Sequence, residues 1–152
     1  MHKWLWISAL VIAVDQMTKW AVFLGMEFHS MIPVLSFFSI VHVHNTGAAF
    51  SFLADAGGWQ RWFFLTIALA TSAFILHLLR KHHQDTLMSI SLALILGGAI
   101  GNVFDRLWHG FVVDFLYFHY QAYAFPAFNV ADSAITIGAV LLIVDGLRHK
   151  KT

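Results

Sequence analysis

The chain has 152 residues, of which 59% are hydrophobic and only 11% are charged. This composition excludes an ordinary soluble domain, in which roughly a quarter of the residues are charged, and predicts a membrane protein with a single domain over residues 1–152. The net charge of +1 is uninformative by itself, but the lack of a basic run longer than the terminal Arg148-His149-Lys150-Lys151 argues against nucleic-acid binding. Zero cysteines exclude disulfides, thiolate nucleophiles and Cys-ligated metals.

Four apolar segments are long enough, or nearly so, to cross a bilayer as helices, which takes about 20 residues. They cover residues 4–24, 62–79, 87–105 and 130–147. Lys3 precedes the first segment as in a secretory signal peptide, but Asp15 and Lys19 interrupt the apolar run and no small-residue cleavage pattern follows. We therefore expect four permanent transmembrane helices, in an all-α membrane fold with a small β-sheet outside the bilayer.

Basic residues cluster at three places that an even number of spans puts on one side of the membrane. These places are the N-terminus, the loop between the second and third spans, and the C-terminus, with Lys3, Arg80, Lys81, Arg148, Lys150 and Lys151. The positive-inside rule makes this side cytoplasmic. Both termini are thus predicted in the cytoplasm, and segments 25–61 and 106–129 on the extracytoplasmic side.

The two extracytoplasmic segments differ in pattern from the spans. Residues 31–44 are rich in Ile, Val and Phe with partial alternation, and Pro33 and Asn45-Thr46-Gly47 punctuate them, which predicts one or two short strands and a turn. Residues 106–129 are rich in aromatics but interrupted by polar residues and Pro126. They are predicted to form a part-immersed loop or strand rather than a fifth span.

Ionisable groups inside a bilayer are costly, so each should be paired or functional. Asp15 and Lys19 are four residues apart on one helix face and can form an internal pair. Asp105 is next to Arg106 at the end of the third span. Because neighbours in a helix do not face each other, each of these two side chains is expected to reach other segments.

Glu27, Asp55 and Asp85 are predicted in aqueous loops and need no partner, and of the remaining acids only Asp114 and Asp132 have no basic residue nearby in the sequence. Both fall at the extracytoplasmic boundary, where contact between them is possible, and Asn129 is positioned to cap the helix that Asp132 opens. Two close carboxylates in a low-dielectric site share one proton, which is the division of labour that an aspartic protease needs. The structural alternative makes Asp132 a helix-terminal acid stabilised by the macrodipole and Asp114 a turn residue.

Two clusters of small and polar residues lie at the same boundary. Gly97 and Gly101 are spaced for close helix packing, and Asn102 and the Asp105-Arg106 pair follow in the next turn. The segment Asn45-Thr46-Gly47-Ala48-Ala49-Phe50 is the second cluster, and as structure alone it is a turn. The ten histidines include no HExxH pattern and no consistent set with carboxylates, so neither a metal site nor a cofactor is predicted.

Five motifs occur together along the chain: Asp15-x-x-Thr18-Lys19, Asn45-Thr46-Gly47-Ala48-Ala49-Phe50, Gly97-Gly98-Ala99-x-Gly101-Asn102-x-x-Asp105-Arg106, Val112-Val113-Asp114-Phe115 and Phe128-Asn129-x-Ala131-Asp132-Ser133. In this order they resemble the bacterial lipoprotein signal peptidases, the signal peptidase II family, over about residues 4–147. The resemblance implies an aspartic endopeptidase of the bacterial inner membrane. Such an enzyme removes the signal peptide from diacylglyceryl-modified prolipoproteins by cutting just before the lipidated cysteine.

The resemblance also implies a role for each matched residue. The catalytic pair of the family falls on Asp114 and Asp132. Substrate-binding or supporting roles fall on Asp15, Lys19, Asn45, Gly47, Asn102, Asp105, Arg106 and Asn129. A sheet that cradles the substrate and a mobile segment over the site would correspond to about residues 26–55 and part of 106–128. The implied partners are the lipid-modified prolipoprotein and membrane lipid, and lateral entry of substrate favours a monomer.

One alternative function belongs to another class, a small four-span transporter or ion relay that uses the intramembrane acids. A relay needs polar groups distributed through the depth of the membrane. The second and fourth spans are apolar below their extracytoplasmic ends, and the first contributes only Asp15 and Lys19. An interaction-only membrane scaffold is a third possibility, and it would leave Asp114 and Asp132 dispensable.

Overall fold

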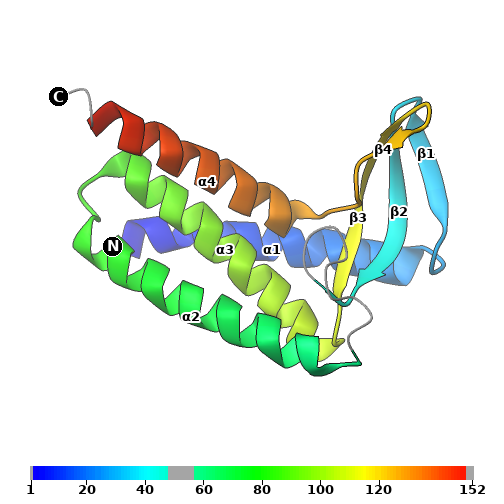
Figure 1. Ribbon diagram of the computed structural model, residues 1–152, viewed down its shortest axis with the longest axis horizontal. Helices are drawn as coiled ribbons and strands as arrows, with labels where there is room; N and C mark the ends of the chain where they lie inside the picture. Colours follow the sequence, from blue (N-terminus) through cyan, green and yellow to red (C-terminus); the bar gives the residue numbers. More distant parts are fainter. Residues whose placement is uncertain (1, 48–56, 150–152) are drawn as a thin grey trace.

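The structure is a computed structural model that describes residues 2–47 and 57–149, which form four long helices and four strands (Figure 1). The helices are α1 (His2–Gly25), α2 (Trp59–Lys81), α3 (Thr86–Trp108) and α4 (Val130–His149). The strands are β1 (Met31–Leu35), β2 (Phe38–Asn45), β3 (Val112–Tyr120) and β4 (Tyr123–Ala124). All four helices are long and apolar enough to cross a membrane, so the predicted fold class is confirmed.

Helix α3 is the centre of the bundle. It packs against each of the other three helices. In an apolar stretch of 18 residues, 56% of the residues of α3 are buried, compared with 22% in the corresponding stretches of α1, α2 and α4. The outward faces carry large apolar side chains such as Trp6, Leu10 and Phe74, which are all more than half exposed. In water these faces would be unfavourable, whereas in a bilayer they contact lipid chains.

Glycines allow α1 and α4 to approach α3 closely. A Cβ atom added at Gly97 would lie 2.9 Å from the carbonyl oxygen of Ser8 in α1, and one added at Gly98 would lie 2.3 Å from the carbonyl oxygen of Ala131 in α4. A Cβ at Gly101 would lie 2.7 Å from a carboxylate oxygen of Asp15. The predicted small-residue packing surface of the third span is therefore confirmed, and it serves two partner helices at once.

The four strands form one antiparallel sheet in the order β1-β2-β3-β4, which stands at one end of the helices with its strands running across them (Figure 1). Strand β2 pairs with β3, so Val43 lies opposite Asp114 and Asn45 opposite Val112. The strands predicted within residues 31–44 are present. Most of the aromatic segment takes the strand alternative rather than the loop, because its residues 112–120 form β3, which pairs with β2 and β4.

Both central strands are irregular near the helices. The register of β2 against β3 shifts between Ile40 and Val43. In β3 the backbone N–H groups of Phe115 and Leu116 both donate to the carbonyl oxygen of Phe128, at 3.0 and 2.8 Å. Two consecutive residues facing one partner residue is the pattern of a β-bulge, which bends a strand and changes the direction of its side chains.

Candidate active site

A cleft of about 940 Å³ lies where α3, α4 and the sheet meet. Asp114 of β3 and Asp132 of α4 both line this cleft, together with Asn45, Asn102 and Arg106. The remaining wall is mainly apolar and includes Val41, Val43, Val112, Phe125, Pro126, Phe128, Ile135 and Ile137. The structure thus places Asp114 and Asp132, the two acids selected from the sequence, on the same cleft.

Asp114 is buried, with 3% of its surface exposed, and both of its carboxylate oxygens accept a hydrogen bond from an asparagine. Asn129 Nδ2 donates to Oδ1 at 2.7 Å, and Asn45 Nδ2 donates to Oδ2 at 3.1 Å. Burial, and after it the negative charge of Asp132, raise the pKa of the Asp114 carboxyl to about 7, although the two asparagine amides act in the opposite direction. Asp114 can therefore hold a proton near neutral pH.

Asp132 lies in the first turn of α4 and is only partly buried. Asn129 caps this helix, because its Oδ1 accepts a hydrogen bond from the backbone N–H of Asp132 at 2.9 Å. The cap is therefore Asn129, as predicted, and the Asp132 carboxylate points instead to Asn102, whose Nδ2 donates to its Oδ1 at 2.8 Å. One side chain, Asn129, contacts both acidic residues.

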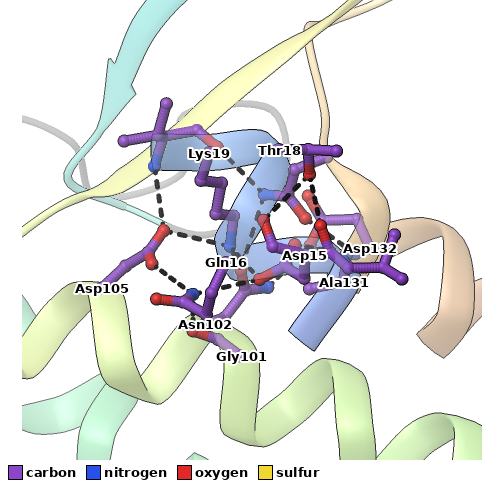
Figure 2. Close-up of polar contacts among 12 residues, drawn as sticks. Asp15, Gln16, Thr18, Lys19, Gly101, Asn102, Asp105, Ala131 and Asp132 are labelled. Carbon is purple, nitrogen blue, oxygen red and sulfur yellow. Dashed lines mark hydrogen bonds and ion pairs between the residues drawn. The ribbon is translucent and has the colours of Figure 1, made fainter. Parts of the chain in front are cut away.

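A buried ionic network lies between α1 and α3 beneath the cleft (Figure 2). Lys19 Nζ lies 2.8 Å from Asp15 Oδ2, 3.0 Å from Asp105 Oδ2 and 2.9 Å from Asn102 Oδ1. The predicted Asp15–Lys19 pair is confirmed, and the partner of Asp105 is Lys19. Because an ammonium group can only donate, Lys19 fixes the Asn102 amide with its oxygen inward and its NH₂ group toward Asp132.

The same network connects to α4 and to β3. Asp15 Oδ1 accepts the backbone N–H of Ala131 at 2.8 Å, directly beside Asp132 (Figure 2). Asp105 Oδ2 accepts the N–H of Val113 at 3.2 Å, directly beside Asp114. Each of the two buried acids thus holds the backbone next to one of the cleft aspartates.

Gln16 also belongs to this network, although the sequence did not indicate it. Its Nε2 donates to Asp105 Oδ1 at 2.8 Å and to the carbonyl oxygen of Gly101 at 3.2 Å (Figure 2). The available signal was its position three residues before Lys19, which places both side chains on one face of α1. Gln16 supplies a second side-chain donor to Asp105, after Lys19, and connects α1 to α3.

Arg106 joins the third span to the turn after β2. Its Nη2 donates to the carbonyl oxygen of Gly47 at 2.7 Å, and the N–H of Gly47 donates to Asn45 Oδ1 at 3.0 Å. This turn orients the Asn45 amide toward Asp114, so the predicted turn is present and Asn45 contacts one of the two cleft acids. Ala48, Ala49 and Phe50 of the same motif lie outside the described residues.

Histidines gather beside the cleft rather than at its acids. His42 Nε2 and His44 Nε2 are 3.0 Å apart, and His42 Nδ1 lies 3.0 Å from the carbonyl oxygen of Met26. His44 lines the cleft, and burial together with the neighbouring imidazoles of His42, His109 and His29 lowers its pKa to about 4. His44 is thus neutral at pH 7. Over residues 2–47 and 57–149, no three His or carboxylate side chains are arranged to hold a metal ion.

Comparison with known proteins gives three consistent results. The family model described as signal peptidase (SPase) II matches residues 7–148. Lipoprotein signal peptidases of Azoarcus sp. (strain BH72) and Burkholderia vietnamiensis (strain G4 / LMG 22486) are 52% and 54% identical, and these alignments cover 99% and 96% of this chain and 86% and 88% of the relatives. Two solved structures of bacterial membrane enzymes superpose with TM-scores of 0.90 and 0.84 at 31% and 30% identity, covering 99% and 97% of this chain and 90% and 94% of theirs.

Fold, cleft and comparisons together define a membrane-embedded protease of the aspartic class. The chain spans a bacterial inner membrane several times, and the alternative of a four-span transporter or ion relay has no support among the proteins that it matches. The chain belongs to the signal peptidase II family.

Proposed function

We propose that this protease removes the signal peptide from diacylglyceryl-modified prolipoproteins, cutting just before the lipidated cysteine, and that Asp114 and Asp132 are its catalytic pair. One observation carries the assignment: the two acids line the same cleft, and Asn129 contacts both. The lipoprotein signal peptidases that the chain resembles supply the class of substrate.

The environments of the two acids suggest different roles. Asp114 is buried and its pKa is raised to about 7, so it is the proton-holding member. Asp132 is more exposed and lies in the first turn of α4, where the positive end of the helix dipole favours a negative charge. We assign Asp132 as the general base that takes a proton from the attacking water. Asp114 then donates a hydrogen bond to the scissile carbonyl oxygen.

The reaction balances without a cofactor. The water oxygen forms a bond to the carbonyl carbon as its proton passes to Asp132, and Asp114 stabilises the tetrahedral oxyanion. The C–N bond then breaks, the leaving amine of the lipidated cysteine takes up a proton from the aspartate pair, and the signal peptide ends in a free carboxyl group. Asn45, Asn102 and Asn129 orient the two carboxyl groups during these steps.

The remaining site residues support this pair. Lys19 orients Asn102, Asp15 and Asp105 hold the backbone beside Asp132 and Asp114, and Arg106 anchors the turn of Gly47. These residues hold the two carboxyl groups in position. Such support matters because a small displacement of a reacting group strongly reduces the rate of the reaction.

We also propose the membrane setting. Residues 1–152 form one peptidase domain with both termini in the cytoplasm and the sheet end, with its cleft, at the extracytoplasmic face, as the basic residues predict. The cleft extends along α4 as far as Ile137, and its apolar side chains there suit the approach of a signal helix and of acyl chains from the surrounding lipid. Lateral entry needs an accessible helix face, so the working unit is a monomer.

The test is cleavage of a purified diacylglyceryl-modified prolipoprotein by the purified full chain in lipid nanodiscs, with the new N-terminal cysteine identified by mass spectrometry. Asp114→Asn and Asp132→Asn should each reduce kcat by about 10³-fold or more. The first variant lacks the proposed acid and the second lacks the proposed general base. Glu27→Gln, an acid-to-amide change at an exposed loop residue, is the matched control. Wild-type rates in either aspartate variant would exclude the pair as catalysts.

A further inference from the structure

We propose that Tyr117 is a substrate-binding residue whose hydroxyl donates a hydrogen bond to a carbonyl oxygen of the substrate at the sheet wall of the cleft. This inference rests on the proposed function, and it adds a specificity-determining contact outside the five sequence motifs. It concerns β3, three residues beyond Asp114.

The bulge in β3 explains how Tyr117 reaches the cleft. In a regular strand, residues three apart point to opposite faces, so Asp114 and Tyr117 would face opposite sides of the sheet. Between these two residues β3 is irregular, because the N–H groups of Phe115 and Leu116 share the carbonyl oxygen of Phe128 and the register against β2 shifts at the same place. Asp114 and Tyr117 consequently line the same cleft.

The ring of Tyr117 is held while its hydroxyl is left available. The ring lies 5.2 Å from that of His119, and His119 Nε2 is fixed by Ser39 Oγ at 2.9 Å. Two other hydroxyls on the cleft are bound to their own helix, Ser133 Oγ to a carbonyl at 2.9 Å and Thr136 Oγ to a carbonyl at 2.8 Å. No hydrogen bond joins the Tyr117 hydroxyl to any residue in the described ranges 2–47 and 57–149.

The surroundings favour a ligand partner for this hydroxyl. The cleft wall around this hydroxyl is lined by the apolar residues Val41, Phe125, Pro126 and Phe128. A hydrogen bond to a polar group of the ligand would therefore stabilise the hydroxyl most when the ligand displaces water from this wall. A substrate of the proposed class offers carbonyl oxygens as acceptors. Tyrosine combines an apolar ring with such a donor, which suits a wall that contacts both lipid and peptide.

Two carbonyl groups of the substrate lie within reach. Three residues of strand span about 10 Å, which from the scissile bond corresponds to about three residues of an extended peptide. An ester carbonyl of the diacylglyceryl group on the adjacent cysteine can extend over a similar length. The shared chemistry is a carbonyl acceptor, in the peptide backbone or in the lipid ester.

The chain offers matched controls, because its three tyrosines are Tyr117, Tyr120 and Tyr123, and the last two are 66% and 80% exposed. Tyr117→Phe removes one oxygen atom and keeps the ring. We expect KM for the lipid-modified prolipoprotein to rise roughly five- to tenfold with kcat nearly unchanged, as for the loss of one hydrogen bond made equally in the ground and transition states. Tyr120→Phe and Tyr123→Phe should leave both constants unchanged, and thermal midpoints should agree across all three variants.

A second substrate locates the acceptor. With an ether-linked dialkylglyceryl prolipoprotein, which lacks the ester carbonyls, an abolished difference between wild type and Tyr117→Phe assigns the contact to the lipid, and a retained difference assigns it to the peptide. A KM for Tyr117→Phe no different from that of the two control variants, while the wild type cleaves and Asp114→Asn does not, overturns the Tyr117 contact and leaves the proposed function intact. Absence of cleavage by the wild type overturns both.

Discussion

Gly98 controls the distance between α3 and α4 at the level of Asp132, and replacing it with alanine should displace Asp132 relative to Asp114, its partner in the proposed catalytic pair. A Cβ atom there would lie 2.3 Å from the carbonyl oxygen of Ala131 and 2.7 Å from Ile135 Cγ1. Carbon–oxygen contacts settle near 3.3 Å, so the first turn of α4 must move by about 1 Å. The moved backbone carries Asp132 with it. A 1 Å misplacement of a catalytic group reduces the rate by about 10²-fold.

A substitution at Gly138 serves as a control that separates a displacement of Asp132 from a loss of stability. At Gly138 an added Cβ would lie 2.7 Å from the carbonyl oxygen of Ser91, in the same α3–α4 interface but two turns further along α4. Both variants should lose roughly 1–3 kcal/mol from overpacking, seen as a lower thermal midpoint by scanning fluorimetry in detergent. We expect only Gly98→Ala to lose most of kcat when the rate is normalised to folded protein.

Gly146→Ala is the control for the helix itself, because nothing lies within 4 Å of its added Cβ, and it should change neither property. The reasoning is refuted if Gly98→Ala cleaves lipid-modified prolipoprotein as fast as Gly146→Ala. Such a result would mean that the close approach of α3 and α4 does not set the position of Asp132.

Two further predictions concern charge. Because the pKa of Asp114 is raised to about 7 and its protonated form is the proposed active form, kcat/KM should fall as pH rises through about 7, whereas a general-base role for Asp114 would make it rise there. A pH–rate profile from pH 5 to 9, with an alkaline limb governed by the aspartate pair, distinguishes the two assignments. Lys19→Met should destabilise the fold by about 3 kcal/mol or more and lower the thermal midpoint, because Asp15 and Asp105 would remain buried without a cation. Lys81→Met, at the exposed end of α2, should have little effect, and equal midpoints for the two lysine variants would contradict the buried network.

Hydropathy and spacing predicted the parts of this molecule that depend on local sequence. The four helices follow from runs of apolar residues, the Asp15–Lys19 pair from a spacing of four, and the cap by Asn129 from its place before α4. Sorting the acids by local basic partners was enough to select the two that share the cleft. Each of these properties can be read within one helix or one turn.

Features that depend on pairing between distant segments could not be predicted in this way. The pairing of β2 with β3 joins residues about seventy positions apart, and the bulge that turns Tyr117 into the cleft depends on the carbonyl of Phe128. The contact of Lys19 with Asp105 likewise requires the close approach of α1 to α3. No local periodicity encodes such contacts, because they arise only when the helices and the sheet have packed.

The position of Lys19 links assembly in the membrane to competence for chemistry. Helix α1 can enter a bilayer with its lysine already neutralised by Asp15, but Asp105 enters on α3 as an acid with no facing cation on its own helix. Bringing α1 and α3 together gives Asp105 its counter-ion and, through the same ammonium group, orients the Asn102 amide that contacts Asp132. A newly inserted chain therefore gains this part of its active site in the same step that relieves an unpaired charge in the bilayer. In a copy in which α1 and α3 have not packed, Asp105 would lack its counter-ion and the Asn102 amide would lack its donor, so we expect stability and activity to be lost together.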